Sequence, residues 1–364
     1  MADHVRSPIR IGDQLIDPPC ALAPMEGITD RGFRRMIRGL GGCGLTVTEF
    51  VSSEAMTREV ERAWQMAEID PGEHPVAIQI YGRDPGRMAQ SARFCETLRP
   101  DLVDLNLGCP SKKVTSGCAG AALMREPGVA ARIFDAVAGA LTIPFTVKMR
   151  LGWDDAHRNA PEIARLAERA GAAMLVVHGR TRTQMYRGQA DWQAVAAVRE
   201  AVTIPVLVNG DIVTVGSALE ALERSGADGV MVGRGVLRNP WLLRQIGEAL
   251  RGEAPFEPTL DDRQRVLLDY FARMIEECDG NPAWYMGRIK KVVSYFTCGL
   301  PHGARLRKSI HRSQTIDAIR RLVARYFELL AEHRVRDAFR ELHDEEAEIA
   351  AGSAMTLTAA TTPG

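Results

Sequence analysis

The sequence predicts a (β/α)8 TIM barrel followed by a C-terminal all-helical domain. Eight short apolar runs recur between residues 20 and 235, segments of helical periodicity separate them, and only the helical pattern continues after about residue 255. Alternating strands and helices are typical of a parallel sheet, and eight repeats are the number that closes a barrel. A doubly wound open sheet is the competing topology. The count of eight disfavours it, as does the lack of a G-x-G-x-x-G after the first run.

The eight predicted strands are short runs rich in Val, Ile and Leu. They cover residues 20–25, 45–50, 75–82, 101–108, 143–150, 172–179, 204–211 and 228–235. Between them, apolar residues recur at three- and four-residue spacing, with Gly or Pro at the ends of the segments. The clearest of these predicted helices are 84–99, 128–141, 160–171 and 215–226.

Beyond the barrel, helices are predicted at 259–278, 282–297 and 313–347. The first of them opens with Thr259 followed by acidic residues in capping positions. We expect the barrel to occupy residues 1–250, the helical domain residues 251–348 and a disordered tail residues 349–364.

The composition is that of a globular protein with a large core, since 46% of the residues are hydrophobic and 25% are charged. The 46 basic and 46 acidic side chains cancel, so the net charge does not indicate a nucleic-acid partner. Charges are scattered through the N-terminal residues, and no run approaches the roughly 20 apolar residues that span a bilayer. We therefore expect a cytoplasmic monomer without membrane contact.

The charge is unevenly distributed along the chain. Residues 281–340 hold thirteen Lys or Arg against four acidic residues, a local net charge of +9. Such a run is often only a solvated helical face. The alternative is a surface that contacts RNA phosphates, and three residues of the run, Arg288, Lys290 and Lys291, are candidates for that contact.

The seven cysteines are odd in number, widely spaced and without a C-x-x-C pair. Neither a disulfide framework nor a zinc site is indicated, and we expect no metal. Cys109 follows the fourth predicted strand between Gly108 and Pro110, where a buried packing role is the alternative to a chemical one. With a reference pKa of about 8.5, a free thiol at such a strand end is a competent proton donor.

In a barrel, functional side chains lie at the C-terminal ends of the strands. Lys148 occupies such an end and by itself could simply extend to solvent. Together with Asn-Gly-Asp at 209–211 and Gly-Arg-Gly at 233–235, it suggests an FMN site. Glycines before a helix let backbone N–H groups approach a phosphate, to which Arg234 adds charge. Lys148 and Gln79 are expected to contact the flavin ring.

His178 ends the sixth predicted strand. A hydrogen-bonded core histidine is the alternative to a site residue here. Arg180 and Arg182 follow in the sequence HGRTR and need anionic partners, which favours the site.

Six ordered motifs resemble the tRNA-dihydrouridine synthases, most closely their bacterial B-type branch. They are APMEGITDRGFR (23–34), LNLGCPSKKVTSGCAGAALM (105–124), VKMRLGWDD (147–155), VHGRTRTQMYRG (177–188), VNGDI (208–212) and GVMVGRGVLRNPWL (229–242). The resemblance implies an FMN-bearing barrel with a helical tRNA-binding domain. It also implies reduction of the C5–C6 bond of tRNA uridines, with NADPH or NADH as the ultimate reductant.

The resemblance also implies roles for individual residues. Cys109 matches the general acid that protonates C5 while hydride from flavin N5 goes to C6, and Asn106 matches a residue facing the uracil. His178 matches a histidine lining the same site. The positions that match flavin-binding residues are Ala23, Pro24, Met25, Gln79, Lys148, Asn209, Gly210, Asp211, Gly233 and Arg234.

Charge and position suggest three further RNA contacts near the barrel mouth, Lys112, Lys113 and Arg182. A uridine inside folded tRNA must be extruded to reach a flavin in a barrel, and phosphate contacts help to offset that cost. Two alternatives stay open at this point. One is a flavin barrel that reduces a free pyrimidine, like dihydroorotate dehydrogenase, and the other is an RNA-binding protein that has lost catalysis.

Overall fold

A computed structural model describes residues 5–276 and 282–332, arranged in two compact units. The first unit ends at Phe256 and the second begins at Glu257. The expected barrel boundary at residue 250 coincides with the end of α11 (Leu242–Leu250). The expected tail over 349–364 lies outside the described residues.

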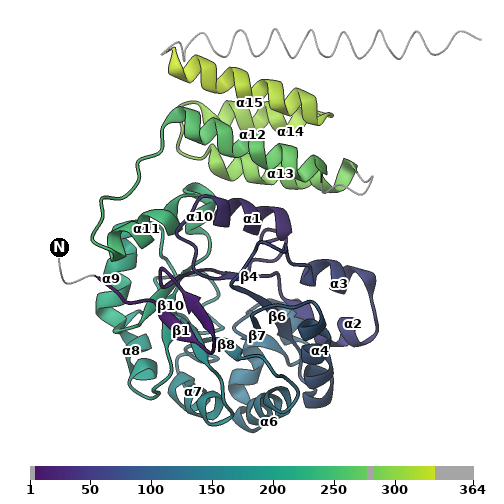
Figure 1. Ribbon diagram of the computed structural model, residues 1–364, viewed down its shortest axis with the longest axis vertical. Helices are drawn as coiled ribbons and strands as arrows, with labels where there is room; N and C mark the ends of the chain where they lie inside the picture. Colours follow the sequence, from purple (N-terminus) through teal and green to yellow (C-terminus); the bar gives the residue numbers. More distant parts are fainter. Residues whose placement is uncertain (1–4, 277–281, 333–364) are drawn as a thin grey trace, which may run out of the picture. The chain divides into compact units, whose positions relative to one another are not determined.

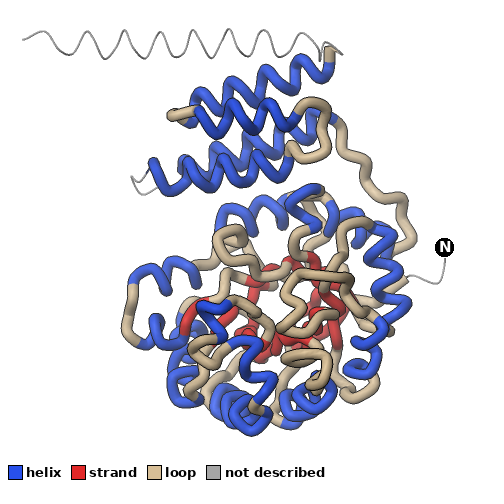
Figure 2. Tube along the Cα trace, turned by 180° about the vertical axis from the view of Figure 1, so that it is seen from behind, coloured by secondary structure: helices blue, strands red, loops and turns tan. Residues whose placement is uncertain are grey.

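The first unit contains a closed barrel of parallel strands (Figures 1 and 2). Its eight strands, as far as the chain is described, are hydrogen-bonded in the order β3-β11-β10-β9-β8-β7-β6-β4. Ala21 and Leu45 close the ring through a parallel bridge. The predicted TIM barrel is therefore confirmed. The strands are β3 Cys20–Leu22, β4 Thr46–Val47, β6 Val76–Tyr81, β7 Leu102–Leu107, β8 Phe145–Arg150, β9 Met174–His178, β10 Val206–Asn209 and β11 Gly229–Val232.

Helices surround the ring of strands (Figure 2), and α1, α2, α4 and α9 begin at a side-chain cap. Asp30 accepts a hydrogen bond from the backbone N–H of Phe33, and Asp84 accepts one from Arg87. Such caps satisfy N–H groups that lack a helical partner. A short strand, β5 (Val51–Ser52), pairs with β6. The helices of this unit are α1 Arg31–Gly39, α2 Ser53–Thr57, α3 Glu61–Ala67, α4 Pro85–Thr97, α5 Lys112–Thr115, the 3₁₀ helix η2 Gly120–Arg125, α6 Pro127–Ala138, α7 Ala160–Arg169, α8 Gln193–Arg199, α9 Val215–Ser225, α10 Gly235–Arg238 and α11.

An antiparallel hairpin fills the N-terminal end of the barrel. It consists of β1 (Ile9–Ile11) and β2 (Gln14–Ile16), and its isoleucines Ile9, Ile11 and Ile16 are buried. They form one core cluster with residues of the barrel strands, including Leu102 and Leu207. The sequence analysis did not predict this hairpin.

Side chains inside the barrel change from apolar to polar along the strands. Side chains two positions apart face the same side of a strand. In β9, Met174 and Val176 belong to the core cluster, and His178 comes next on the same face. In β10, Leu207 is followed in the same way by Asn209. The C-terminal mouth of the barrel is therefore its polar end.

The second unit is all helical, as predicted. Its described helices are α12 Leu260–Glu276, α13 Pro282–Phe296, α14 Gly303–Arg312 and α15 Ile316–Ala331. Helix α14 was not predicted. The helix expected over 313–347 begins later, at Ile316, with Thr315 as its N-cap, and residues 333–347 are outside the described part. None of the helices in the described ranges has the length and hydropathy to cross a bilayer.

Candidate active site

Strand register brings the polar side chains of the mouth next to one another. In neighbouring strands Gln79 pairs with Asp104, Asn106 with Lys148, and His178 with Asn209. Asn106, His178 and Asn209 lie at or next to the C-terminal ends of their strands, as the barrel prediction required. Gln79, Asp104 and Lys148 lie further inside theirs. Because adjacent strands in a sheet are about 5 Å apart, these side chains form a polar arc across β6 to β10.

Cys109 is a free, half-buried thiol whose backbone is held by two side chains from the barrel wall. The Asn106 Oδ1 atom accepts hydrogen bonds from the backbone N–H of Gly108 (3.0 Å) and of Cys109 (2.8 Å). Arg150 donates from Nε to the Gly108 carbonyl at 2.8 Å. Burial raises the pKa of the Cys109 thiol above its ordinary value, which keeps the thiol protonated at neutral pH.

Asn106 is fixed in turn by a network that includes an acid the sequence analysis overlooked. Asn106 Nδ2 donates to Gln79 Oε1 at 2.7 Å, and Gln79 Nε2 donates to Asp104 Oδ2 at 2.5 Å. Thr146 Oγ1 donates to the other carboxylate oxygen of Asp104. Burial raises the pKa of Asp104 above its ordinary value. An acid in the middle of an apolar strand, DLVDLNL, was the available signal.

Lys148 extends into the mouth from β8 and has a perturbed amine. Its Nζ donates to Asn209 Oδ1 at 3.2 Å, and Asn209 Nδ2 donates to the Met231 carbonyl at 2.8 Å. Burial, and then the nearby charge of Arg150, lower the pKa of Lys148 to about 8. Among the described residues, this amine donates one hydrogen bond, to an amide oxygen, which leaves N–H groups available for a bound anion.

His178 is buried with its Nδ1 atom lacking a hydrogen-bond partner among the described residues. Burial lowers the pKa of His178 well below its ordinary value, and the charges of Arg150, Lys148, Arg180 and Arg234 lower it further. The ring is therefore neutral. An unpartnered buried nitrogen is costly in a closed structure, so its presence indicates a place for a ligand.

The turn after β10 brings backbone and cationic groups together. Gly210 (φ +112°) and Asp211 (φ +54°) both have positive φ angles, and a Cβ atom on Gly210 would lie 3.0 Å from that of Ala190. Arg180 pairs with both carboxylate oxygens of Asp211. The anionic partner that we expected for Arg180 is therefore Asp211, a residue of the same chain. Burial would raise the pKa of Asp211, but the hydrogen bonds from Arg180 and Ala190 outweigh it and the pKa is lowered.

Arg234 is exposed at this corner and faces two different groups. Its guanidinium lies 3.6 Å from an oxygen of Asp211 and 4.7 Å from the ring centroid of Tyr186. Arg150 lies 5.6 Å from the same ring. Tyr186 is 54% exposed, and the sequence analysis did not select it as a site residue. A cation beside an aromatic face is favourable and fixes the orientation of both groups.

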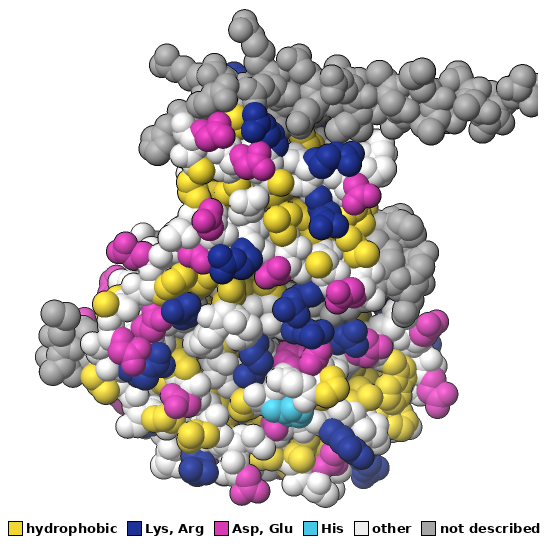
Figure 3. Space-filling model, turned by 45° about the horizontal axis from the view of Figure 1, so that its top comes forward, with side chains coloured by type: hydrophobic (Ala, Val, Ile, Leu, Met, Phe, Trp, Pro, Cys, Tyr) yellow, Lys and Arg dark blue, Asp and Glu magenta, His cyan; other side chains and the backbone are white. Residues whose placement is uncertain are grey.

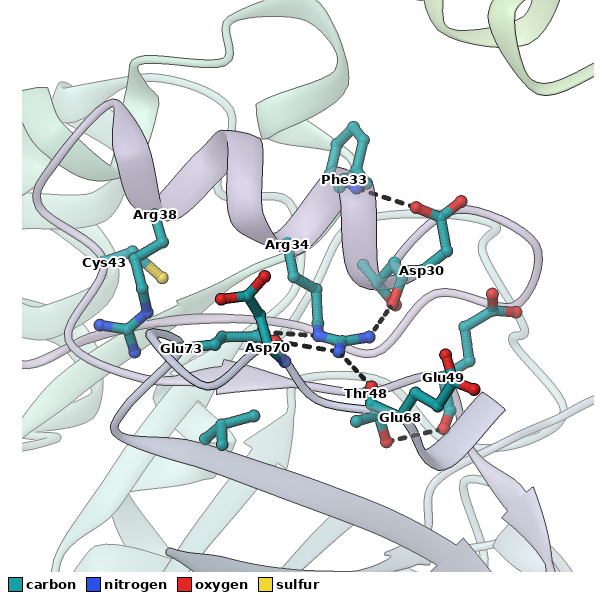
Figure 4. Close-up of polar contacts among 12 residues, drawn as sticks. Asp30, Phe33, Arg34, Arg38, Cys43, Thr48, Glu49, Glu68, Asp70 and Glu73 are labelled. Atoms are coloured by element: carbon teal, nitrogen blue, oxygen red, sulfur yellow. Dashed lines mark hydrogen bonds and ion pairs between the residues drawn. The ribbon is translucent and has the colours of Figure 1, made fainter. Parts of the chain in front are cut away.

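The residues of the predicted FMN turn, Ala23, Pro24 and Met25, follow β3. Thr29 Oγ1 accepts from the backbone N–H of Met25 at 2.9 Å, and the Thr29 carbonyl accepts from Arg34 Nη1 at 2.9 Å. Arg34 and Glu73 are both 1% exposed and form a bidentate ion pair (Figure 4). A buried ion pair therefore supports the backbone of this turn.

The predicted RNA contacts at the mouth lie on the rim. Lys112 and Lys113 are exposed on α5, directly after Cys109. Arg182 stacks over Trp153, 4.6 Å from the ring centroid, and donates to Thr115 Oγ1 at 3.1 Å. On the face seen in Figure 3, Lys and Arg side chains alternate with Asp and Glu over the barrel and do not form one basic surface.

In the helical unit, the three side chains predicted to contact RNA differ in their exposure and in the hydrogen bonds they already make. Lys290 donates to the carbonyls of His311 (2.9 Å) and Ser313 (2.7 Å), which caps the end of α14. Arg288 is half-buried, and burial lowers its pKa to about 10. Lys291 is also half-buried. By contrast, Arg305, Lys308 and Arg312 are exposed at three- and four-residue spacing along one face of α14.

Comparison with known proteins gives consistent matches. The family model described as dihydrouridine synthase matches residues 21–361. A probable tRNA-dihydrouridine synthase of Rhodobacter capsulatus is 48% identical over 71% of this chain and 82% of its own length. Another from Rickettsia bellii is 40% identical over 88% of this chain and 98% of its own. The tRNA-dihydrouridine synthase B of Pseudomonas aeruginosa is 37% identical over 88% and 96%, respectively.

A solved structure, a 2-naphthoyl-CoA reductase in complex with 2-naphthoyl-CoA, matches with a TM-score of 0.53 and 12% identity. The match covers 69% of this chain and 53% of that structure, so this chain spans about half its length. At this identity the likeness concerns the fold alone. The family model and the curated relatives confirm the resemblance read from the motifs, and they show that the chain belongs to the dihydrouridine synthase family.

Proposed function

We propose that this protein reduces the C5–C6 double bond of uridines in tRNA to 5,6-dihydrouridine, with bound FMN and with NADPH or NADH as the source of electrons. The observation that carries the proposal is the placement of a protonated thiol, Cys109, in the same barrel mouth as Lys148 and the unpartnered Nδ1 of His178. Family membership supports the substrate class. A tRNA substrate supports a cytoplasmic location.

The residues of the mouth fit a flavin mononucleotide. Bound there, the flavin supplies the hydride that goes to C6. Gly210, Gly233 and Arg234 would hold its phosphate, since the turn at Gly210 excludes a side chain and Arg234 is exposed beside it. Lys148 and Gln79 would contact the ring, and the neutral His178 would offer an unprotonated nitrogen or an N–H, depending on its tautomer. Ala23, Pro24 and Met25 would cover it, with Asn209 and Asp211 shaping the pocket.

Cys109 would donate the proton that C5 needs. Its Sγ–H bond breaks, the proton goes to C5, and the thiolate that remains is reprotonated from solvent. The raised pKa ensures that the thiol is present when the uracil arrives. Asn106, which fixes the backbone of Cys109, would also present its amide to the uracil edge.

The helical unit would hold the tRNA while the uridine is extruded. Its residues 281–340 carry a net charge of +9, and the exposed row Arg305, Lys308 and Arg312 on α14 is best placed for phosphates. Lys290 would contribute less, because its ammonium is already bonded to two carbonyls. At the mouth, Lys112, Lys113 and Arg182 would contact the nucleotides that flank the uridine.

The test is dihydrouridine mapping in tRNA from cells that lack the gene, after rescue with wild type or with Cys109→Ala. Wild type should restore dihydrouridine at defined positions and the variant should not. Purified protein should be yellow from bound flavin. Turnover of a free pyrimidine without RNA would instead support a small-molecule reductase. A colourless protein that binds tRNA would indicate an RNA-binding protein without catalysis.

A further inference from the structure

The turn that follows β3 has a fixed backbone, which determines where Glu26 lies. Glu49 Oε2 accepts a hydrogen bond from the backbone N–H of Gly27 at 2.5 Å. On the other side of Glu26, the backbone N–H of Met25 is bonded to Thr29, whose carbonyl is held by Arg34. Glu26 therefore stands between two anchored residues. Its own side chain is half-exposed at the barrel mouth.

Glu26 bridges from this turn to the segment that carries the catalytic thiol. Its Oε1 lies 3.7 Å from Nζ of Lys113, and the two side chains are 50% and 78% exposed. Lys113 belongs to α5, four residues after Cys109. The other end of α5 is tied to the rim beyond β9 by the hydrogen bond between Arg182 and Thr115. The segment after Cys109 is thus held from both sides of the mouth.

The charges that surround Cys109 divide into two groups. Burial is the main cause of its raised pKa; among the charges, Glu26 raises the pKa further, and Arg150 and Lys148 from β8 lower it. Glu26 is therefore the charged group that favours the protonated thiol. The charge of Glu26 also raises the pKa of Glu49. Burial is the main cause of that raised pKa, and the charges of Arg62 and Arg34 lower it.

We propose that Glu26 is a positioning residue for the segment that carries Cys109: its ion pair with Lys113 holds α5 beside the turn after β3, and exchange of that pair for an RNA phosphate when tRNA binds changes the charge around the thiol. This inference rests on the proposed function of Cys109 and of the rim lysines. An exposed ion pair with a 3.7 Å separation is weak and is readily displaced by a more highly charged anion. Once Lys113 turns to a phosphate, the charge of Glu26 acts on the thiol without its counter-ion. Substrate binding would then strengthen the hold of Cys109 on its proton.

The first test measures the pH profile of Cys109 alkylation by iodoacetamide in the flavoprotein, resolved by peptide mass mapping. Glu26→Gln should move the midpoint down by about half a pH unit, because a negative charge near the thiol is lost. That shift corresponds to about threefold faster alkylation at any pH well below the midpoint. Lys113→Gln should move the midpoint up. In the double variant the midpoint should equal that of Glu26→Gln, since Lys113 acts through Glu26.

The control is Glu200→Gln, which removes an equally exposed carboxylate from the C-terminal end of α8. This end leads into β10 and so lies at the end of the barrel opposite the mouth. Its alkylation profile should match that of wild type. A Glu26→Gln profile that coincides with wild type overturns the proposal, because a merely structural role would leave the midpoint in place.

The second test measures binding of tRNA. Glu26→Gln should bind about two- to threefold more tightly than wild type, since a competitor for Lys113 and a charge that repels phosphate are both removed. Lys113→Gln should bind more weakly. Equal affinity of wild type and Glu26→Gln overturns the exchange with phosphate. Failure of wild type to form dihydrouridine, with the alkylation shift intact, would reject the proposed function and leave the assignment of Glu26 to Cys109 standing.

Discussion

Cys109 owes its position to two side chains of the barrel wall. Asn106 holds its backbone N–H, and Arg150 holds the carbonyl of Gly108. Half-burial in this frame raises the pKa of the thiol. A thiol in this state is an acid and not a nucleophile, which suits protonation of a carbon atom.

Cys109→Ala should lower the rate of dihydrouridine formation by about 10²- to 10⁴-fold, the usual contribution of a general acid. Flavin absorbance and thermal stability should stay close to wild type, since the backbone contacts of Cys109 do not use its side chain. The rate is measured with tRNA that lacks dihydrouridine. Cys118→Ala, at an exposed cysteine in the same loop, is the control and should keep full activity. Equal loss in both variants would contradict the assignment.

Lys148 gives a second prediction because burial lowers its pKa to about 8. The amine is protonated below that pH and neutral above it. If it stabilises negative charge on the reduced flavin, reduction above pH 8 draws an additional proton onto Lys148. The midpoint potential should then fall more steeply with pH, by about 30 mV more per pH unit for a two-electron couple.

Potentiometric titration of the bound flavin between about pH 6.5 and 9.5 measures this slope. Lys148→Met, which keeps the length of the side chain without its charge, should show no break near pH 8. The same slope above and below pH 8 in wild type would argue against an interaction of Lys148 with the reduced ring.

The sequence pattern predicted Cys109, Lys148 and His178 as site residues, because each lies at or near the end of an apolar run. It did not reveal that Arg180 binds Asp211, since 31 residues separate them and only the fold brings them together. Asp104 was not predicted as a site residue, because it is a single acid among the five other residues of a strand-like run. The role of Lys290 as a cap for α14 depends on a helix that was not predicted.

At the scale of elements, the barrel strands were predictable from the sequence, whereas the hairpin of β1 and β2 and helix α14 were not. Each barrel strand is buried on both sides and therefore reads as a continuous apolar run. The hairpin of β1 and β2 has three residues in each strand, too few for alternation to be recognised. In α14 only Leu306 and Ile310 are buried apolar side chains among basic neighbours, so that its periodicity is weak.

The support under the turn after β3 depends on the pair Arg34 and Glu73, which are both 1% exposed. Arg34→Met would leave a buried carboxylate without its partner, and we expect the barrel to lose about 3–5 kcal/mol of unfolding free energy. Urea titration followed by tryptophan fluorescence measures the loss. Replacing both residues by Met should restore part of it. Arg35→Met, at an exposed pair with Asp70, should cost less than about 1 kcal/mol.

The exposed row on α14 predicts how tRNA binding responds to salt. Replacing Arg305, Lys308 and Arg312 by Ala should weaken binding and reduce the slope of log affinity against log salt by about 2 to 3, since each phosphate contact contributes about 0.7 to 0.9. Filter binding over a range of salt concentrations gives the slope. Lys290→Met should instead destabilise the end of α14 with little change of slope. The reverse pattern would place the RNA surface on α13.

At the scale of the whole molecule, chemistry and charge are divided between the two units. The mouth residues come from the unit that ends at Phe256, whereas the stretch with a net charge of +9 lies beyond it. This division explains why the chain as a whole is neutral. The sequence indicated the division because the alternation of strands and helices stops near residue 255 and the basic stretch begins beyond that point, at residue 281.

The hairpin of β1 and β2 has a consequence for the order of events in a catalytic cycle. Its isoleucines fill the N-terminal end of the barrel and leave the C-terminal end as the way in. In the proposed function, the nicotinamide and the uridine would both enter through this mouth, and we expect them to bind in turn. Steady-state rates measured against both substrates should give parallel double-reciprocal lines, and intersecting lines would show that the two can be present together. With the hairpin filling one end, the barrel would bind its two proposed substrates alternately through the other end.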